Sequence, residues 1–297
     1  MSRGTRSEAW AGWAFLAPAL AVILLFFVLP VLGGLALSLT NFDIYAIGDP
    51  ATARFVGLEN YRALVTSPVF WRSMGNTFYF VLLAGPLSVA LSLLAALLVN
   101  SPLARWRGLF RTVYFAPVVT TLVAVAVVWR YLYHPRFGLL NRALEAVGIE
   151  AIDWLGDPRT AMPAIILVAV WKSFGYNMVI FVAGLQAIPV SLYEAARIDG
   201  AGFWRRFWHI TVPGLKPTFL FVGLTTMIGY FQLFAEPYVM TAGGGPLNAT
   251  LSVVLYMYKE GFRWWNMGYA AAVAFALFLV ILAATLIQLR LQRGRAQ

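Results

Sequence analysis

The sequence predicts an all-α polytopic membrane protein, and the prediction depends on composition and on the distribution of charge. Of the 297 residues, 61% are hydrophobic and 11% are charged, whereas an ordinary soluble domain has about 25% charged residues. The charged residues are also clustered, which leaves long stretches without any. A soluble protein of this length could not keep so much apolar surface out of water. A soluble enzyme and a disordered or secreted scaffold are therefore excluded.

Six apolar stretches predict six membrane-spanning helices. A helix rises about 1.5 Å per residue, so roughly 20 residues cross a hydrocarbon layer of about 30 Å. The predicted spans lie near residues 11–39, 74–99, 112–131, 161–187, 218–238 and 267–289, and the fourth is interrupted only by Lys172. The stretches lack the alternating pattern of barrel strands, so helices are the remaining way to cross the membrane. Four prolines in or near these spans predict kinks: Pro18, Pro30, Pro86 and Pro117.

The first apolar stretch is expected to remain as an uncleaved helix. Arg3 and Arg6 form a basic start of the kind that signal peptides have. The apolar stretch that follows is about twice as long as the apolar region of a signal peptide, and no convincing cleavage site follows it.

Loop charges predict the orientation of the spans. An even number of spans places both termini on one side of the membrane. The terminal segments and the loops 100–111 and 189–217 together hold twelve Lys and Arg residues, and the opposite loops hold eight. The positive-inside rule therefore places both termini in the cytoplasm. The net charge of +10 fits contact with anionic lipid headgroups. No basic stripe alternates with aromatic residues, so nucleic acid is not an expected partner.

The residue types needed for catalysis are scarce. There is no cysteine, and the two histidines are His134 and His209. We therefore assign no catalytic residue, metal site or cofactor, and an intramembrane enzyme is disfavoured. Glu236 is the one carboxylate within the predicted spans, whereas a proton-coupled carrier normally has more.

The chain also lacks a phosphate-binding G-x-x-x-x-G-K-[ST] motif, and the glycine-rich segment 243–246 is predicted to be a turn. Six helices are few for a free-standing transporter, many of which contain two related halves. The chain is therefore expected to form half of a pathway, with energy supplied by another subunit or by a solute gradient.

The loop 189–217 carries the most specific pattern. Ser191 and Glu194 predict a capping box at the start of a short helix that runs to about Asp199 and breaks at Gly200. A second short helix is predicted from Phe203 to His209, ending before Pro213. Four aromatic residues, Phe203, Trp204, Phe207 and Trp208, would then be available for a partner. The residues alone allow a second interpretation, in which Glu194 only caps the helix and the aromatic side chains lie at the membrane interface.

This loop resembles a known family motif. Glu194-Ala195-Ala196, three further residues, Gly200, nine residues, Ile210 and Pro213 have the spacing of the EAA motif. That motif occurs in permease subunits of bacterial binding-protein-dependent ABC importers. Val212 departs from the usual Leu. Other stretches, including 15–19, 55–61 and 234–241, are similar to permeases of the maltose and glycerol-3-phosphate type, so the resemblance covers nearly the whole chain.

The resemblance implies a type I ABC importer permease fold and a non-catalytic subunit in the bacterial cytoplasmic (inner) membrane. It also implies as partners two ABC ATPase subunits, a second permease subunit, with a heterodimer favoured, and a periplasmic or extracellular solute-binding protein. The ATPase would be coupled through Glu194, Ala195, Ala196, Asp199, Gly200, Ile210 and Pro213. The expected divisions are an N-terminal segment with the first span (1–71), a permease domain (72–289) that contains the coupling loop 189–217, and a basic tail (290–297).

The solute pathway is expected at mid-membrane depth on the spans that flank the coupling loop. Polar and aromatic groups there supply hydrogen bonds and flat faces for a sugar. The candidates are Lys172, Tyr176, Asn177, Tyr230, Gln232 and Glu236. For Asn177, Tyr176 and Gln232 the alternative is hydrogen bonding within the helix bundle, and for Lys172 and Glu236 it is an ion pair.

Two other functions stay open at this stage. One is an importer of the same type for a glycerol-phosphate or polyol solute, since a phosphorylated solute would favour a cationic site and Lys172 could supply it. The other is a self-contained carrier driven by a solute gradient, which would work without a nucleotide-binding partner. The sequence does not identify the sugar.

Overall fold

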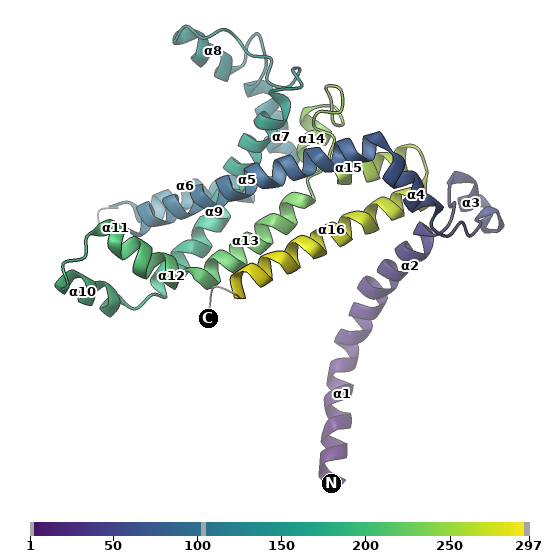
Figure 1. Ribbon diagram of the computed structural model, residues 1–297, viewed down its shortest axis with the longest axis horizontal. Coiled ribbons are helices and arrows are strands. Elements are labelled where there is room, and N and C mark those ends of the chain that lie inside the picture. The colour runs from purple at the N-terminus through teal and green to yellow at the C-terminus, as the bar shows by residue number, and fades with distance from the viewer. Residues whose placement is uncertain (1–2, 102–104, 294–297) are drawn as a thin grey trace. The chain divides into compact units, whose positions relative to one another are not determined.

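The structure, a computed structural model, describes residues 3–101 and 105–293 (Figure 1). These residues form helices and connecting loops, and their one β contact is an isolated bridge between Thr40 and Phe55. The chain divides into two compact units, one made of residues 1–67 and 257–278 and the other of residues 68–256 and 279–297.

The first unit contains the N-terminal apolar segment and the short helices that follow it. Its helices are α1 (Arg3–Ile23), the π-helical η1 (Leu24–Val28), α2 (Leu29–Ser38), α3 (Ile44–Gly48), η2 (Pro50–Thr52), α4 (Glu59–Thr66) and η4 (Lys259–Arg263). The π-helical turn η1 comes directly before Pro30, whose ring would clash with the carbonyl of Phe26 in a regular α-helix. The side chain of Asp43 accepts backbone hydrogen bonds from Tyr45 and Ala46 and so caps α3.

The second unit contains the remaining helices. They are α5 (Pro68–Asn100), α6 (Arg107–Val119), α7 (Leu122–Leu132), α8 (Leu139–Ala146), α9 (Ala161–Gln186), α10 (Val190–Ile198), α11 (Phe203–Arg206), the π-helical η3 (Phe207–Thr211), α12 (Val212–Gly214), α13 (Lys216–Phe231) and α14 (Ala235–Met240). α15 (Val253–Tyr258) and α16 (Met267–Arg293) begin in one unit and end in the other.

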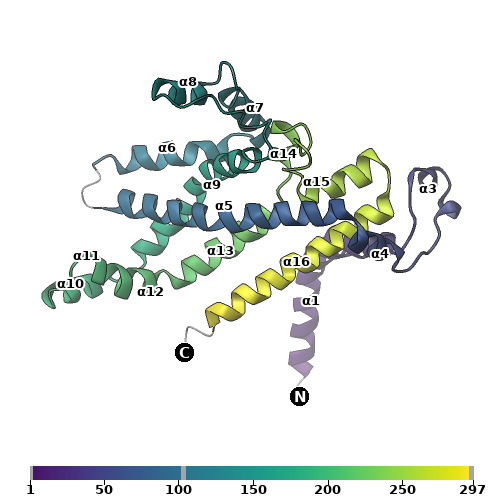
Figure 2. The ribbon, with the colours of Figure 1, turned by 45° about the horizontal axis from the view of Figure 1, so that its top comes forward.

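Helix α9 is the centre of the second unit, and it packs on α5, α6 and α13. Figure 2 shows α5 and α6 running alongside one another, with α9 next to them. Small residues allow these helices to approach closely. A side chain at Gly175 would collide with the backbone carbonyl of Tyr114 on α6, and Ala95 and Ala96 of α5 are buried with Met178 of α9 in a common apolar core.

Five predicted spans are confirmed as long apolar helical segments among the described residues. Those segments are Trp10–Ser38, Pro68–Asn100, Ala161–Gln186, Lys216–Met240 and Met267–Leu291. The segment Lys216–Met240 contains a break of three residues, Gln232–Phe234, between α13 and α14. Pro30 lies in the first turn of α2, next to η1, and Pro18 and Pro86 lie within helices that continue past them.

The third predicted span, 112–131, is not a single helix. It is broken between α6 and α7, whose axes are bent by 99°. The two residues at the break, Thr120 and Thr121, have extended backbones. Pro117 lies just before the break, and its carbonyl accepts a hydrogen bond of 2.6 Å from the Thr120 hydroxyl. The helix therefore ends where side-chain groups bond to its last carbonyls, which the apolar composition of the segment gave no reason to expect.

Segment 243–246 is a turn, as predicted. Gly243 and Gly244 have φ values of 90° and 99°, a conformation that favours glycine. Part of the predicted basic tail, residues 294–297, lies outside the described residues.

Candidate solute cavity and coupling loop

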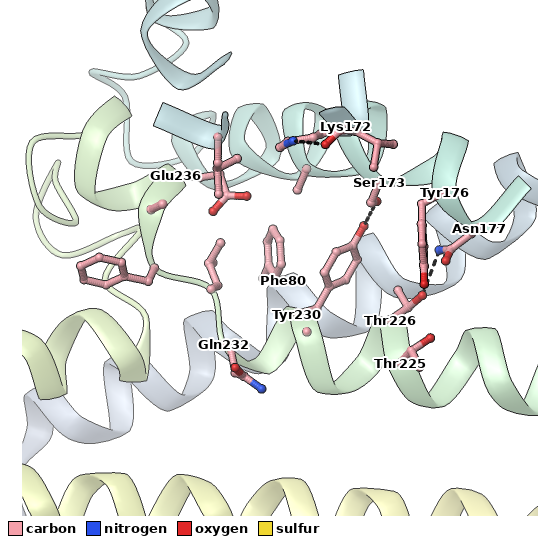
Figure 3. A pocket seen from close by; sticks show the side chains of 17 residues that line it. Phe80, Lys172, Ser173, Tyr176, Asn177, Thr225, Thr226, Tyr230, Gln232 and Glu236 are labelled. Atoms are coloured by element: carbon pink, nitrogen blue, oxygen red, sulfur yellow. Dashed lines mark hydrogen bonds between the residues drawn. The ribbon is translucent and has the colours of Figure 1, made fainter. Parts of the chain in front are cut away.

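A cavity of about 480 Å³ lies among α9, α13, α14 and the break between α6 and α7 (Figure 3). Its volume is within the range of small-molecule sites. All six residues that the sequence indicated for the solute pathway line this cavity: Lys172, Tyr176, Asn177, Tyr230, Gln232 and Glu236. The structure thus brings together residues that are up to 64 positions apart in the sequence.

Lys172 is bonded to the end of a helix. Its ammonium donates hydrogen bonds to the backbone carbonyls of Pro117 at 3.0 Å, Val118 at 3.5 Å and Thr120 at 2.9 Å. These carbonyls belong to the last turn of α6 and to the break that follows, where no next turn of helix supplies N–H donors. A cation is also favoured there by the helix dipole. These three carbonyls therefore stabilise the ammonium of Lys172 within the span.

Glu236 lies on the opposite wall, in the first turn of α14. It is 9% exposed, and its carboxylate points into the space between α9 and α13 in Figure 3. Among the described residues, no hydrogen bond from another side chain to this carboxylate is recorded. Glu236 reaches this position because the helix that begins at Lys216 stops at Phe231 and restarts at Ala235.

Hydroxyl and amide groups connect the helices on the third wall. The Ser173 hydroxyl lies 2.6 Å from the Tyr230 hydroxyl, and the Asn177 amide donates to the Thr226 hydroxyl at 2.9 Å. Asn177 is 4% exposed and also lies 3.5 Å from the Ser88 hydroxyl. Asn177 therefore forms hydrogen bonds between helices of the bundle, which was the alternative to a role in solute binding.

The remaining two candidates, Tyr176 and Gln232, are exposed. Tyr176 is 49% exposed, so one face of its ring is available to a solute. Gln232 is also exposed, but its side chain points away from Lys172 and Glu236 in Figure 3.

Sequence reasoning missed several residues of the lining. Ser173, Thr225 and Thr226 are polar residues of the same two spans as the candidates, and this signal could have found them. Phe80 comes from α5, and its ring lies 5.1 Å from that of Tyr230. No pattern in the sequence distinguishes Phe80 from the other phenylalanines of its span.

The coupling loop 189–217 forms helices, but the predicted capping box is wrong. Helix α10 begins at Val190 with Pro189 as its N-cap, and no side chain caps it. Ser191 and Glu194 therefore lie inside the helix. The fixed φ of Pro189 suits a residue at the start of a helix, and the helix begins two residues earlier than the capping box predicted. Gly200 follows the end of α10 with a φ of +72°, which agrees with the predicted break.

The second predicted helix, 203–209, extends further than expected. Helix α11 continues as η3 through Thr211 and as α12 through Gly214. Pro213 does not end this segment, and it closely follows the π-helical η3, as Pro30 follows η1. A hydrogen bond of 2.9 Å between the hydroxyls of Tyr193 and Thr211 connects the two arms of the loop.

The motif residues divide into two groups. Glu194, Ala195, Asp199 and Gly200 are exposed on α10 and its end, whereas Ile210 is packed against the apolar core of the second unit. Ala196 is half-buried and Pro213 is exposed. Apolar side chains on the same helix are also exposed, and Ile198 is 88% accessible. The aromatic residues of α11 and η3 contact one another, with Phe203 and Trp204 5.4 Å apart. The loop thus combines a fixed base with an open apolar surface.

Comparisons with known proteins agree with these features. The chain is 40% identical over 288 residues to the lactose transport system permease protein LacF of Rhizobium radiobacter, covering 96% of this chain and 94% of that protein. It is 34% identical over 286 residues to the arabinooligosaccharides transport system permease protein AraP of Bacillus subtilis, covering 96% and 89%.

The fold is similar to that of a chain in a bacterial alginate ABC transporter, which was solved in complex with an alginate pentasaccharide-bound periplasmic protein. The TM-score is 0.80 at 22% sequence identity, covering 98% of this chain and 96% of that one. Residues 62–297 match the family described as "Binding-protein-dependent transport system inner membrane component". This match confirms the family resemblance, and the chain belongs to the binding-protein-dependent transport system inner membrane components.

Proposed function

We propose that this chain is the permease subunit of an ABC importer that moves a sugar or oligosaccharide across the bacterial cytoplasmic membrane. The solute arrives on a periplasmic or extracellular binding protein. The chain itself catalyses no reaction, and a separate ATPase subunit hydrolyses ATP. The names of the relatives, which refer to lactose and arabinooligosaccharides, support a sugar as the solute.

The observation that carries the proposal is the exposed surface of α10 within the loop 189–217. Val190, Leu192 and Ile198 are 67%, 50% and 88% exposed, and an apolar surface of this kind favours a partner protein. Glu194, Ala195, Ala196, Asp199 and Gly200 lie on this helix and at its end. The loop is fixed to the core through Ile210, so a force applied to α10 would reach α9 and α13.

The assembly that follows has two ATPase subunits, this chain and a second permease subunit, with a heterodimer favoured. Both termini lie in the cytoplasm, and the permease domain comprises about residues 72–289, with an N-terminal segment before it and a basic tail after it. The positive-inside bias of the loops supports this orientation.

Co-purification tests the partners. The full-length chain is purified in mild detergent as wild type, as Glu194→Lys and as the control Glu145→Lys, which places the same change on the exposed short helix α8. We expect an ATPase and a second permease with the wild type and the control, and loss of the ATPase from Glu194→Lys. A chain that runs alone in every case and still moves solute when reconstituted would support the gradient-driven carrier instead.

Gly200→Leu tests the coupling itself. Leucine in the left-handed conformation of Gly200 costs about 1–2 kcal/mol, which would distort the end of α10 without touching the bundle. We expect normal membrane insertion with loss of uptake. Gly202→Leu is the control, because Gly202 has a negative φ and open space around it. Normal uptake by a stably expressed Gly200→Leu variant would contradict the coupling role of this loop.

A glycerol-phosphate or polyol solute is the second candidate within the same type of importer. Lys172 is the observation that favours it, since an ammonium in the cavity could pair with a phosphate. Competition of uptake by glycerol phosphate, compared with a neutral sugar, distinguishes the two.

A further inference from the structure

The two charged residues of the cavity have different surroundings, and this difference bears on the charge of the solute. We propose that the cavity is selective against anionic solutes, because Lys172 is committed to the end of helix α6 whereas Glu236 faces the solute. The inference rests on the proposed function, and it specifies that the solute is uncharged and rich in hydroxyl groups.

The first step concerns Lys172. Its ammonium has three hydrogen-bond donors, and it lies within 3.5 Å of three backbone carbonyls. The C-terminus of a helix carries the equivalent of about half a negative charge, which offsets part of the charge of the ammonium. A phosphate or carboxylate of a solute would have to take the ammonium away from these carbonyls. The carbonyls of Val118 and Thr120 would then lose the Lys172 donor, and that of Pro117 would keep the Thr120 hydroxyl.

The second step concerns Glu236. Among the seventeen described residues that line the cavity, Lys172 and Glu236 are the charged ones. Glu236 is 9% exposed, and its oxygens point toward the cavity (Figure 3). A carboxylate accepts hydrogen bonds from solute hydroxyls, and in its ionised form it repels a solute that is itself an anion.

The third step concerns the uncharged lining. The hydroxyls of Ser173 and Tyr230 form a pair that can exchange hydrogen bonds with a solute hydroxyl. The ring of Tyr176, a residue that is 49% exposed, supplies a flat apolar surface on the same cavity. These groups suit a neutral sugar, and none of them supplies a counter-charge for an acid.

Charged thiol reagents test this inference directly. The chain has no cysteine, so a single cysteine can be introduced without removing any. Gly229→Cys places a thiol on the cavity wall, where an added Cβ has no heavy atom within 4 Å. Thr52→Cys, in an exposed loop of the first unit, is the reference. The reaction rates of trimethylammonioethyl and sulfonatoethyl methanethiosulfonate are measured on the full-length chain in native membranes.

We expect the cationic reagent to be favoured at Gly229→Cys relative to Thr52→Cys by about five- to tenfold, the effect of one unit charge at short range in a partly aqueous site. Glu236→Gln in the Gly229→Cys background should abolish most of this preference. An equal or reversed preference, a preference that Glu236→Gln leaves unchanged, or no reaction with either reagent would overturn the inference. If Glu236→Gln does not fold, the comparison of Gly229→Cys with Thr52→Cys still shows whether the cavity favours the cationic or the anionic reagent.

Uptake separates this inference from the proposed function. Cells that express the full transporter are given lactitol, as a neutral probe, and lactobionate, as an acidic probe with the same galactosyl open-chain skeleton. Uptake of both at the same rate would overturn the inference and leave the importer standing. A cationic preference in the labelling experiment together with uptake that needs no ATPase would overturn the importer and leave the charge selectivity standing.

Discussion

The first and fourth spans are both long apolar helical segments, but they have opposite surroundings. In the most apolar window of Trp10–Ser38 no residue is buried within the protein, whereas 61% of the corresponding window of Ala161–Gln186 is buried. The exposed span consists almost entirely of apolar residues, and the buried span contains Lys172, Ser173 and Asn177. In a membrane protein, therefore, strong hydrophobicity indicates contact with lipid, whereas small and polar residues indicate the protein core.

The largest expected effect is a steric one on the buried span. Gly175→Leu would drive a side chain into the backbone of Tyr114 on α6, and overpacking of a core costs about 3 kcal/mol or more at its upper range. We expect little monodisperse protein in size-exclusion chromatography after gentle heating.

Gly33→Leu is the matched control on the first span. A Cβ at Gly33 meets no atom within 4 Å, so the same substitution should leave the elution profile unchanged. Equal losses from both variants would contradict the assignment of the first span to lipid.

The next effect concerns the break of the third span. Lys172→Met removes an ammonium that donates to three carbonyls, of which that of Pro117 keeps the Thr120 hydroxyl as a donor. Because these acceptors are only partly buried, we expect a cost at the lower end of about 1–3 kcal/mol. A lower midpoint of thermal unfolding in nanodiscs is the expected result.

Lys259→Met is the control for this variant. Partial burial, and then the neighbouring Arg263, lower the pKa of the Lys259 ammonium. The charged form is thus disfavoured in the folded protein, and its removal should not destabilise the chain. If Lys172→Met has the midpoint of the wild type, the carbonyls of α6 are satisfied in another way.

A smaller effect is expected from the polar network. Asn177→Ala loses the hydrogen bond to Thr226, and interhelical hydrogen bonds in membranes contribute about 0.6–2 kcal/mol. Tyr176→Phe, one residue earlier and half exposed, should have no effect on the unfolding midpoint. If Tyr176→Phe lowers the unfolding midpoint more than Asn177→Ala does, Tyr176 and not Asn177 is the residue that stabilises the bundle.

The smallest effect is expected on the first span. Phe26 is 72% exposed, so Phe26→Leu should change the free energy of unfolding by less than about 0.5 kcal/mol. The comparison becomes sharper if this variant is also purified with its partner subunits. Loss of a partner without loss of stability would make the first span a subunit interface instead of a surface for lipid.

Much of the fold could be predicted, since the length of an apolar stretch is a local property. Five spans begin and end close to where the charges predicted them, because charged side chains mark the edge of the hydrocarbon layer. For the third span, 112–131, the prediction of one straight helix missed the 99° bend between α6 and α7. The ammonium of Lys172 on α9, more than 50 residues away in the sequence, bonds to the carbonyls at this bend, and no local pattern contains that contact.

The residues of the candidate site could be predicted from the sequence, whereas their surroundings could not. Lys172 and Glu236 are conspicuous in the sequence because charges are rare inside a membrane, and both line the cavity. Their different surroundings could not be predicted, since they depend on where α6 ends and where α14 begins. The capping box at Ser191 failed for a local reason, because Pro189 offers a competing helix start.

By itself, the sequence determined that this protein crosses a membrane as helices, which apolar stretches they occupy, and which loop carries the motif of its family. These properties follow from the energetic cost of placing charges and unpaired backbone groups in hydrocarbon, and that cost acts on each segment separately. Only the tertiary structure decided that the third span is bent, that α9 is the core, and that Lys172 is held by helix carbonyls while Glu236 faces the cavity. Those features depend on atoms from distant segments that come together only when the helices pack.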